Sequence, residues 1–215
     1  MSTEHEICSV EQLRGVLRKR RIGSDDRKVM GWLDEHCRRF IELSPFVVIA
    51  SHDEQGNLDV SPKGDPPGFV RILDDRTLAV PERKGNRRCD TFTNVLQRPE
   101  VAMIFLVPGE DLTLRVMGTA SITTDPELLC TMAVQGKEPP IALRVDVNEA
   151  FIHCGKAPKR ARLWNPETQV PQGTFPRMGE MLHDQMTAKY DTDELELSRT
   201  EYGDLTDADY EHNVY

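Results

Sequence analysis

The sequence lacks long apolar runs. Its mean hydropathy is -0.50 and no run of 18 apolar residues occurs, which excludes a transmembrane helix. Residues 1–15 also lack the basic stretch followed by an apolar stretch that marks a signal peptide. We therefore expect a cytoplasmic protein without a membrane partner.

Cysteine pairs and common phosphate-loop motifs are missing as well. The five cysteines are an odd number and show no CxxC spacing, which is typical of reduced thiols. His153 and Cys154 are adjacent, and adjacent strand residues point to opposite faces, so we expect no metal site there. Neither GxGxxG nor GxxxxGK[ST] occurs, which excludes these two phosphate loops.

The chain has no excess of positive charge. It carries 27 Lys and Arg against 36 Asp and Glu, a net charge of -9, which argues against a general nucleic-acid partner. Nine acids but only one base, Arg199, lie in residues 191–215, which we expect to form a solvated extension or an arm over a dimer. The bases elsewhere are clustered, notably within 83–88 and 156–162.

The local pattern predicts many short strands and few helices, which favours a mainly β (α+β) fold built on a closed or partly closed antiparallel barrel. Apolar runs bounded by turn residues predict strands at 46–50, 58–62, 69–73, 77–80, 101–107, 112–120, 141–147 and 151–154. Helices are predicted at 9–19, from Ser24-Asp25 to before Pro45, at 87–97, after Asp125-Pro126, near 156–163 and around 178–186.

The segment PERKGNRRCDTFTNVLQRP (81–99) is the most informative one for function. A predicted strand ends at Val80, a basic loop with a glycine follows, and a helix is predicted to begin near Arg87. Backbone N–H groups at a helix N-terminus, with arginines beside them, can bind phosphate. A solvated basic turn would produce the same pattern, so both interpretations stay open.

A second candidate lies on the strand predicted at 58–62. Ser61 and Lys63 flank Pro62, and a proline in a strand indicates an edge or a bulge where the backbone can face a ligand. An ordinary edge-strand lysine is the alternative interpretation.

These segments, in this order, resemble the pyridoxamine 5'-phosphate oxidase-related FMN-binding split-barrel family. The resemblance covers roughly residues 40–165 and implies a six-stranded antiparallel split β-barrel with flanking helices, which forms a homodimer with FMN at the interface. It is carried by DVSPKG (59–64), LAVPERKGNRRCDTFTNVLQRPEVAMIFLVPG (78–109) and TLRVMGTA (113–120), while HCGKAPKRARLW (153–164) is similar to one branch of the family.

The resemblance also implies a set of FMN-binding residues. By position, Asn86, Arg87 and Arg88 would hold the phosphate, and Arg115 would approach the pyrimidine edge of the flavin. Ser61, Pro62 and Lys63 match positions beside the ring and the ribityl chain, and Val80, Pro81 and Glu82 match the strand before the basic loop. Lys156, Arg160 and Trp164 would cover the flavin from the partner subunit.

Two motifs of the true oxidase do not occur in register, namely R-x-x-x-x-K on its first FMN strand and an R-x-R-type substrate motif. Pyridoxamine phosphate oxidation is therefore not expected. The sequence instead predicts an FMN-binding oxidoreductase that acts on an unidentified small molecule, with a non-catalytic flavin carrier or sensor as the alternative. The expected parts are an N-terminal helical segment (1–44), the split-barrel domain (45–165) and an extension with the acidic tail (166–215).

Overall fold

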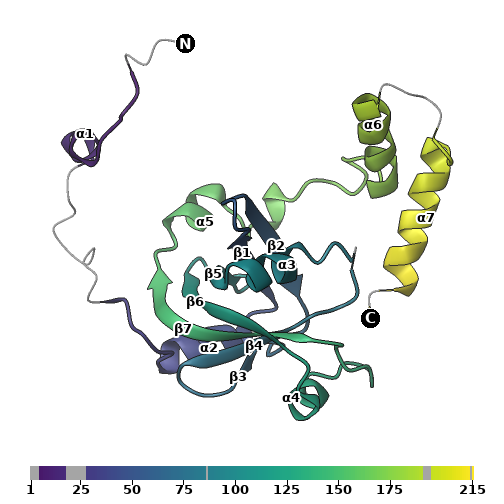
Figure 1. Cartoon of the computed structure of the whole chain (residues 1–215). Helices are drawn as coiled ribbons and strands as arrows, with labels where there is room; N and C mark the ends of the chain where they lie inside the picture. Colours follow the sequence, from purple (N-terminus) through teal and green to yellow (C-terminus); the bar gives the residue numbers. More distant parts are fainter. Residues whose placement is uncertain (1–4, 18–27, 86, 191–194, 214) are drawn as a thin grey trace.

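The computed structural model describes residues 5–17, 28–85, 87–190, 195–213 and 215 (Figure 1). Its centre is one antiparallel sheet of seven strands, which does not close into a complete barrel. The sheet order is β2-β1-β5-β6-β7-β4-β3, so β2 and β3 are its two edges. The strands are β1 (Phe46–His52), β2 (Leu58–Gly64), β3 (Arg71–Ile72), β4 (Thr77–Pro81), β5 (Glu100–Leu106), β6 (Thr113–Thr123) and β7 (Ala142–His153).

The antiparallel sheet is confirmed, but the six strands implied by the family resemblance and the eight predicted from the local pattern are both wrong, because the sheet has seven. The segments predicted as separate strands at 141–147 and 151–154 form one long strand, β7, which pairs with β6. A register shift between Met117 and Gly118 lets the pairing continue past a bend. A Cβ atom at Gly118 would clash with the backbone oxygen of Asp146, so this close approach requires glycine.

The helices are α1 (Val10–Val16), α2 (Glu35–Leu43), α3 (Asp90–Gln97), α4 (Pro126–Thr131), α5 (Lys156–Ala161), the 3-10 turn η2 (Pro166–Thr168), α6 (Met178–Tyr190) and α7 (Arg199–His212). Helices α2 and α3 pack on the sheet, whereas α1 lies apart from it (Figure 1). Among the described residues, no helix combines the length and the apolar character needed to cross a membrane.

Helix α2 begins later than the sequence pattern predicts. Asp34 caps it, because its carboxylate accepts a hydrogen bond from the backbone N–H of Cys37 at 2.8 Å. The chain just before this cap is tied to β7 by two backbone hydrogen bonds between Met30 and Ala150, 3.1 and 2.7 Å long. This bridge keeps the segment out of the helix, although its apolar spacing is helical. The predicted start at Ser24-Asp25 lies outside the described residues.

The core lies between the inner face of the sheet and the apolar faces of α2 and α3. Alternate residues of β1, β5 and β6 point into it, as the alternating pattern of their sequences requires. Its most buried members include Ile41, Val47, Ile49, Leu78, Val80, Phe105, Leu114 and Val116, and α3 adds Phe92 and Val95. On the opposite face of the sheet, the outward side chains of β2 are exposed and those of β1 and β5 are mostly half-buried.

Helices α6 and α7 form a hairpin beside the sheet (Figure 1), and α7 is not among the helices expected from the sequence pattern. The local signal for α7 is a capping box, in which Ser198 and Glu201 each bind the backbone N–H of the other. At Gly179 a Cβ atom would clash with the backbone of Tyr202, so glycine lets the two helices approach closely.

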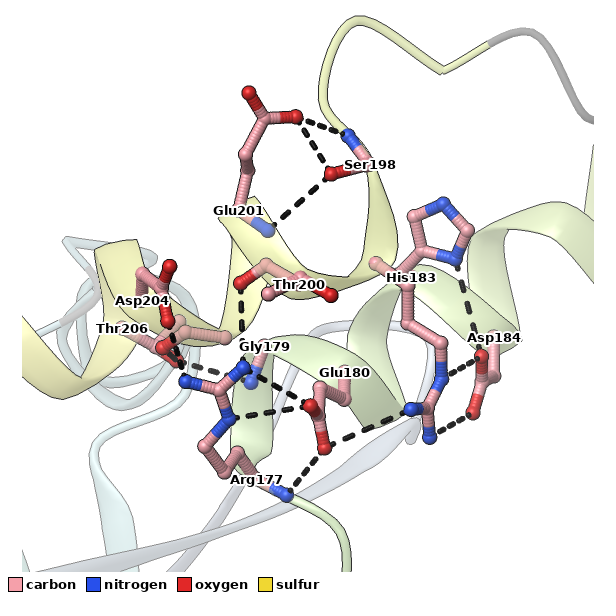
Figure 2. Close-up of polar contacts among 12 residues, drawn as sticks. Arg177, Gly179, Glu180, His183, Asp184, Ser198, Thr200, Glu201, Asp204 and Thr206 are labelled. Atoms are coloured by element: carbon pink, nitrogen blue, oxygen red, sulfur yellow. Dashed lines mark hydrogen bonds and ion pairs between the residues drawn. The ribbon is translucent and has the colours of Figure 1, made fainter.

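One arginine, Arg177, contacts three carboxylates of this α6–α7 hairpin. The guanidinium of Arg177 donates to Glu180 at 3.0 and 3.1 Å, to Asp204 at 2.6 Å and to Asp207 at 3.3 Å (Figure 2). Arg199 pairs with Asp184 in the same way, at 2.8 and 3.1 Å. These ion pairs join carboxylates of α6 and α7, and the only buried residue described in each helix is a glycine, Gly179 and Gly203.

Candidate functional site

Two adjoining cavities lie where the two ends of the open sheet face each other, near β2 on one side and the end of β4 on the other. The first cavity has a volume of about 360 Å³ and the second about 330 Å³, sizes that are typical of small-molecule sites. Four residues line both cavities: Ser61, Pro62, Lys63 and Glu82. Because they share these walls, one elongated ligand could extend through both.

Two ion pairs bridge the gap between the ends of the sheet. Lys63 on β2 contacts Glu82, just after β4, with 2.6 Å between Nζ and Oε2. Arg83 contacts Asp65 with 2.6 Å between Nε and Oδ2, and it also donates to the backbone oxygen of Met132 at 2.7 Å. The Asp65 side chain is only 1% exposed, so this second pair is almost completely removed from water.

The second cavity lies at the N-terminus of α3. The cap residue Cys89 has a left-handed backbone (φ 58°), and its side chain makes no cap hydrogen bond. The N–H groups of the first turn of α3 therefore have no acceptor in the cap side chain. Arg88 and Lys63 line the same cavity. A helix N-terminus beside two cationic side chains suits an anionic group such as phosphate.

Three carboxylates also line the second cavity, those of Asp59, Glu82 and Asp90, and each is engaged by a neighbouring side chain. Asp90 accepts a hydrogen bond from Arg88 at 2.7 Å, and this bond raises the pKa of the Arg88 guanidinium. Asp59 accepts a hydrogen bond from Thr91 at 3.2 Å. The two cations at the cavity wall thus already hold carboxylates, and a phosphate group would bind there by displacing one of these partners.

The basic loop before α3 differs from the prediction in one respect. We expected the helix to begin near Arg87, but α3 begins at Asp90. Both Arg87 and Cys89 have positive φ angles, 57° and 58°, which a helix does not allow. The Arg87 side chain is exposed and lines neither cavity, whereas Asn86 lies outside the described residues.

Six of the predicted residues come together around these cavities: Ser61, Pro62, Lys63, Pro81, Glu82 and Arg88. Val80 does not join them, because its side chain is buried in the core. Arg115 lies on the outer face of β6, with its guanidinium 5.4 Å from the centre of the Phe151 ring. Lys156 and Arg160 are exposed on α5, and Trp164 donates from Nε1 to the backbone oxygen of Glu110 at 2.8 Å.

Sequence reasoning missed three residues at this site. Asp65 directly follows the strand that carries Ser61 and Lys63, so its position was a usable signal. Arg83 belongs to the basic cluster at 83–88, but the sequence does not indicate that it pairs with the buried Asp65. Tyr215 also lines the first cavity, and nothing in the local sequence indicates that.

The sequence model of one protein family, described as pyridoxamine 5'-phosphate oxidase, matches residues 33–154, which is more than half of the chain. The chain belongs to this family. The matched range contains the whole sheet and almost all residues of both cavities, which supports the resemblance inferred from the sequence. It ends before α5, so the α6–α7 hairpin and Tyr215 lie beyond the part that defines the family.

Solved structures of similar shape cover about half of this chain. They include HupZ of Group A Streptococcus (20% identity, TM-score 0.46, 55% of this chain and 92% of that chain), an FMN-binding protein from Syntrophomonas wolfei (12%, 0.41, 54% and 88%), and HutZ, the heme storage protein from Vibrio cholerae (16%, 0.40, 56% and 93%). Identities and scores this low transfer neither a ligand nor an activity. No curated protein matches the sequence.

Proposed function

We propose that this chain binds FMN, with the phosphate in the second cavity and the flavin ring in the first. The observation that carries the proposal is the position of Arg88 and the α3 N-terminus in a cavity that continues into another one along Ser61, Pro62 and Lys63. The first cavity adds the apolar surfaces of Phe69 and Pro81, against which a flat ring can lie. Membership of the family supports the same ligand.

The reaction we propose is flavin-dependent oxidation or reduction of a small molecule. FMN, when bound, supplies the hydride or electron transfer, and the protein supplies position and charge. Lys63 lines both cavities, and its ammonium group now pairs with the Glu82 carboxylate at 2.6 Å. An anionic ligand would compete with Glu82 for Lys63. A carrier or sensor would use the same pocket, so turnover has to be measured.

A direct binding experiment tests the proposal. We expect the purified protein to quench FMN fluorescence on titration and to bind FMN more tightly than riboflavin, because only FMN places a phosphate beside Arg88. Reduction of the bound flavin by NADH or NADPH, followed by reoxidation by an acceptor, would distinguish an enzyme from a carrier. Hemin is titrated in parallel. A protein that binds hemin but leaves FMN fluorescence unchanged would contradict the proposal.

We also propose a homodimer that pairs through the outer face of the sheet. Apolar side chains are exposed along β2, with Leu58 at 81% and Val60 at 63%, an arrangement that marks an interaction surface when it is continuous. Ile104 and Met117 continue this face on β5 and β6, where Arg115 also lies. A second copy seated there would border the cavities and could bring its own Arg115 towards them.

The dimer proposal predicts that Val60→Lys produces a monomer, because it places a charge on the exposed apolar face that the contact would bury. Sedimentation at micromolar concentration measures the change, and Leu96→Lys is the matched control, since Leu96 is 77% exposed on α3 and away from this face.

Mixing an Arg88→Ala chain with an Arg115→Ala chain should restore one intact site per mixed dimer. A wild-type monomer with full FMN affinity would contradict the proposal.

A further inference from the structure

Two residues after α7, Asn213 and Tyr215, contact segments that follow strands and helices of the sheet region, and Tyr215 lies at the candidate site. Tyr215 lines the first cavity together with Pro62 and Phe69. Its hydroxyl group donates a hydrogen bond to Asp65, 2.7 Å from Oδ1. Asp65 is the buried carboxylate that also pairs with Arg83. The tyrosine is thus attached to the ion pair that joins the two ends of the sheet.

Two more hydrogen bonds hold this segment in place. Lys137 donates to the backbone oxygen of Tyr215 at 2.8 Å, and Lys84 donates to the side-chain oxygen of Asn213. The three anchors come from three separate barrel segments, namely those after β2, after β4 and after α4. The hydrogen bond to Asp65, together with burial, raises the pKa of Tyr215, so the phenol keeps the proton that it donates.

We propose that Tyr215 is a ligand-contact residue of this site, with its ring forming one wall of the cavity that takes the flavin ring. The proposal rests on the proposed function, FMN binding. Tyr215 lies beyond residues 33–154, so the family match does not assign it a role. It adds an aromatic surface to a cavity whose other apolar surfaces come from two prolines and Phe69, and aromatic rings stack favourably on flat ligands.

The volume of the first cavity indicates whether Tyr215 forms part of its wall or fills it. With Tyr215 in place the first cavity still measures about 360 Å³, which leaves room for a ligand. A plug would have filled that space, and its removal would strengthen binding. A wall adds contact area, so its removal should weaken binding.

The test compares Tyr215→Ala with Tyr190→Ala, a control at the end of α6 whose side chain is 63% exposed and lines neither cavity. Tyr215→Ala should weaken FMN and riboflavin alike, by roughly tenfold, because the lost contact is to the ring shared by both ligands. Tyr215→Phe keeps the ring but loses the hydrogen bond to Asp65. Its flavin affinity should lie between that of the wild type and that of Tyr215→Ala. The control should bind like the wild type.

A spectroscopic readout follows the contact itself. The chain has four tyrosines, so protein labelled with 3-fluorotyrosine should give four fluorine signals, and Tyr215→Phe assigns the one of interest. Adding FMN should shift that signal and leave the Tyr190 signal unchanged. Tighter flavin binding by Tyr215→Ala, or unchanged binding with no shift, would overturn the inference while FMN binding stands. A wild-type protein that binds no flavin would overturn both.

Discussion

Replacing Arg88 with glutamine should weaken FMN binding by roughly tenfold to a hundredfold, and should leave riboflavin binding nearly unchanged. Arg88 lines the second cavity beside the N-terminus of α3, where a charge-assisted hydrogen bond to phosphate is strong. Glutamine keeps polar donors but removes the charge, and riboflavin has no phosphate to lose. Fluorescence titrations with both ligands at one fixed ionic strength measure the difference.

Arg87→Gln is the matched control, because Arg87 precedes Arg88 directly but lines neither cavity. From the sequence alone, both arginines are expected to hold the phosphate. The geometry predicts that only the change at Arg88 has a large effect. Raising the salt concentration should reduce the advantage of FMN over riboflavin in the wild type, because salt screens an exposed ionic contact. Equal losses for FMN and riboflavin in Arg88→Gln would place the phosphate elsewhere.

The parts of the fold that the sequence predicts are those with local signals. Alternating apolar residues, as in Thr113–Thr123, and the turn residues between strands determine which face of each strand is buried. The same locality brings Ser61 and Lys63 to one side of β2, since residues two apart on a strand share a face. The resemblance of the intervening loops to a known family then placed Glu82 and Arg88 near them.

The parts that the sequence does not predict depend on distant contacts. The start of α2 is fixed by the backbone bridge between Met30 and Ala150, which overrides helical apolar spacing in that segment. The hydrogen bond from Tyr215 to Asp65 joins residues 150 positions apart, and no periodic pattern can show such a contact. Helix α7 lacks a sustained apolar face, so only its capping box at Ser198 signals it.

Replacing Asp65 with alanine should lower the free energy of unfolding by about 3–5 kcal/mol, because a buried charge would lose its partner. The Asp65 side chain is 1% exposed and that of Arg83 is 17% exposed, with 2.6 Å between the charged groups. Without the carboxylate, the Arg83 guanidinium would retain the backbone oxygen of Met132 as its only described partner. Urea unfolding curves of the wild type and the variant measure the loss.

An exposed ion pair provides the control for this loss. Arg162 and Glu167 also lie 2.7 Å apart, but their side chains are 56% and 78% exposed, so Glu167→Ala should change the unfolding free energy by less than about 1 kcal/mol. The double variant Asp65→Leu with Arg83→Met should recover most of the stability lost in Asp65→Ala, because apolar residues can replace a buried ion pair at little cost.

The same variants connect stability with the site. The Asp65–Arg83 pair joins the chain after β2 to the chain after β4, across the open side of the sheet, and Asp65 also accepts the hydrogen bond from Tyr215. The double variant should therefore be stable yet bind FMN and riboflavin more weakly, and by similar factors, since the first cavity loses one anchored wall. That pattern differs from Arg88→Gln, which affects FMN alone. A double variant that is stable and binds both flavins like the wild type would show that the pair does not shape the cavity.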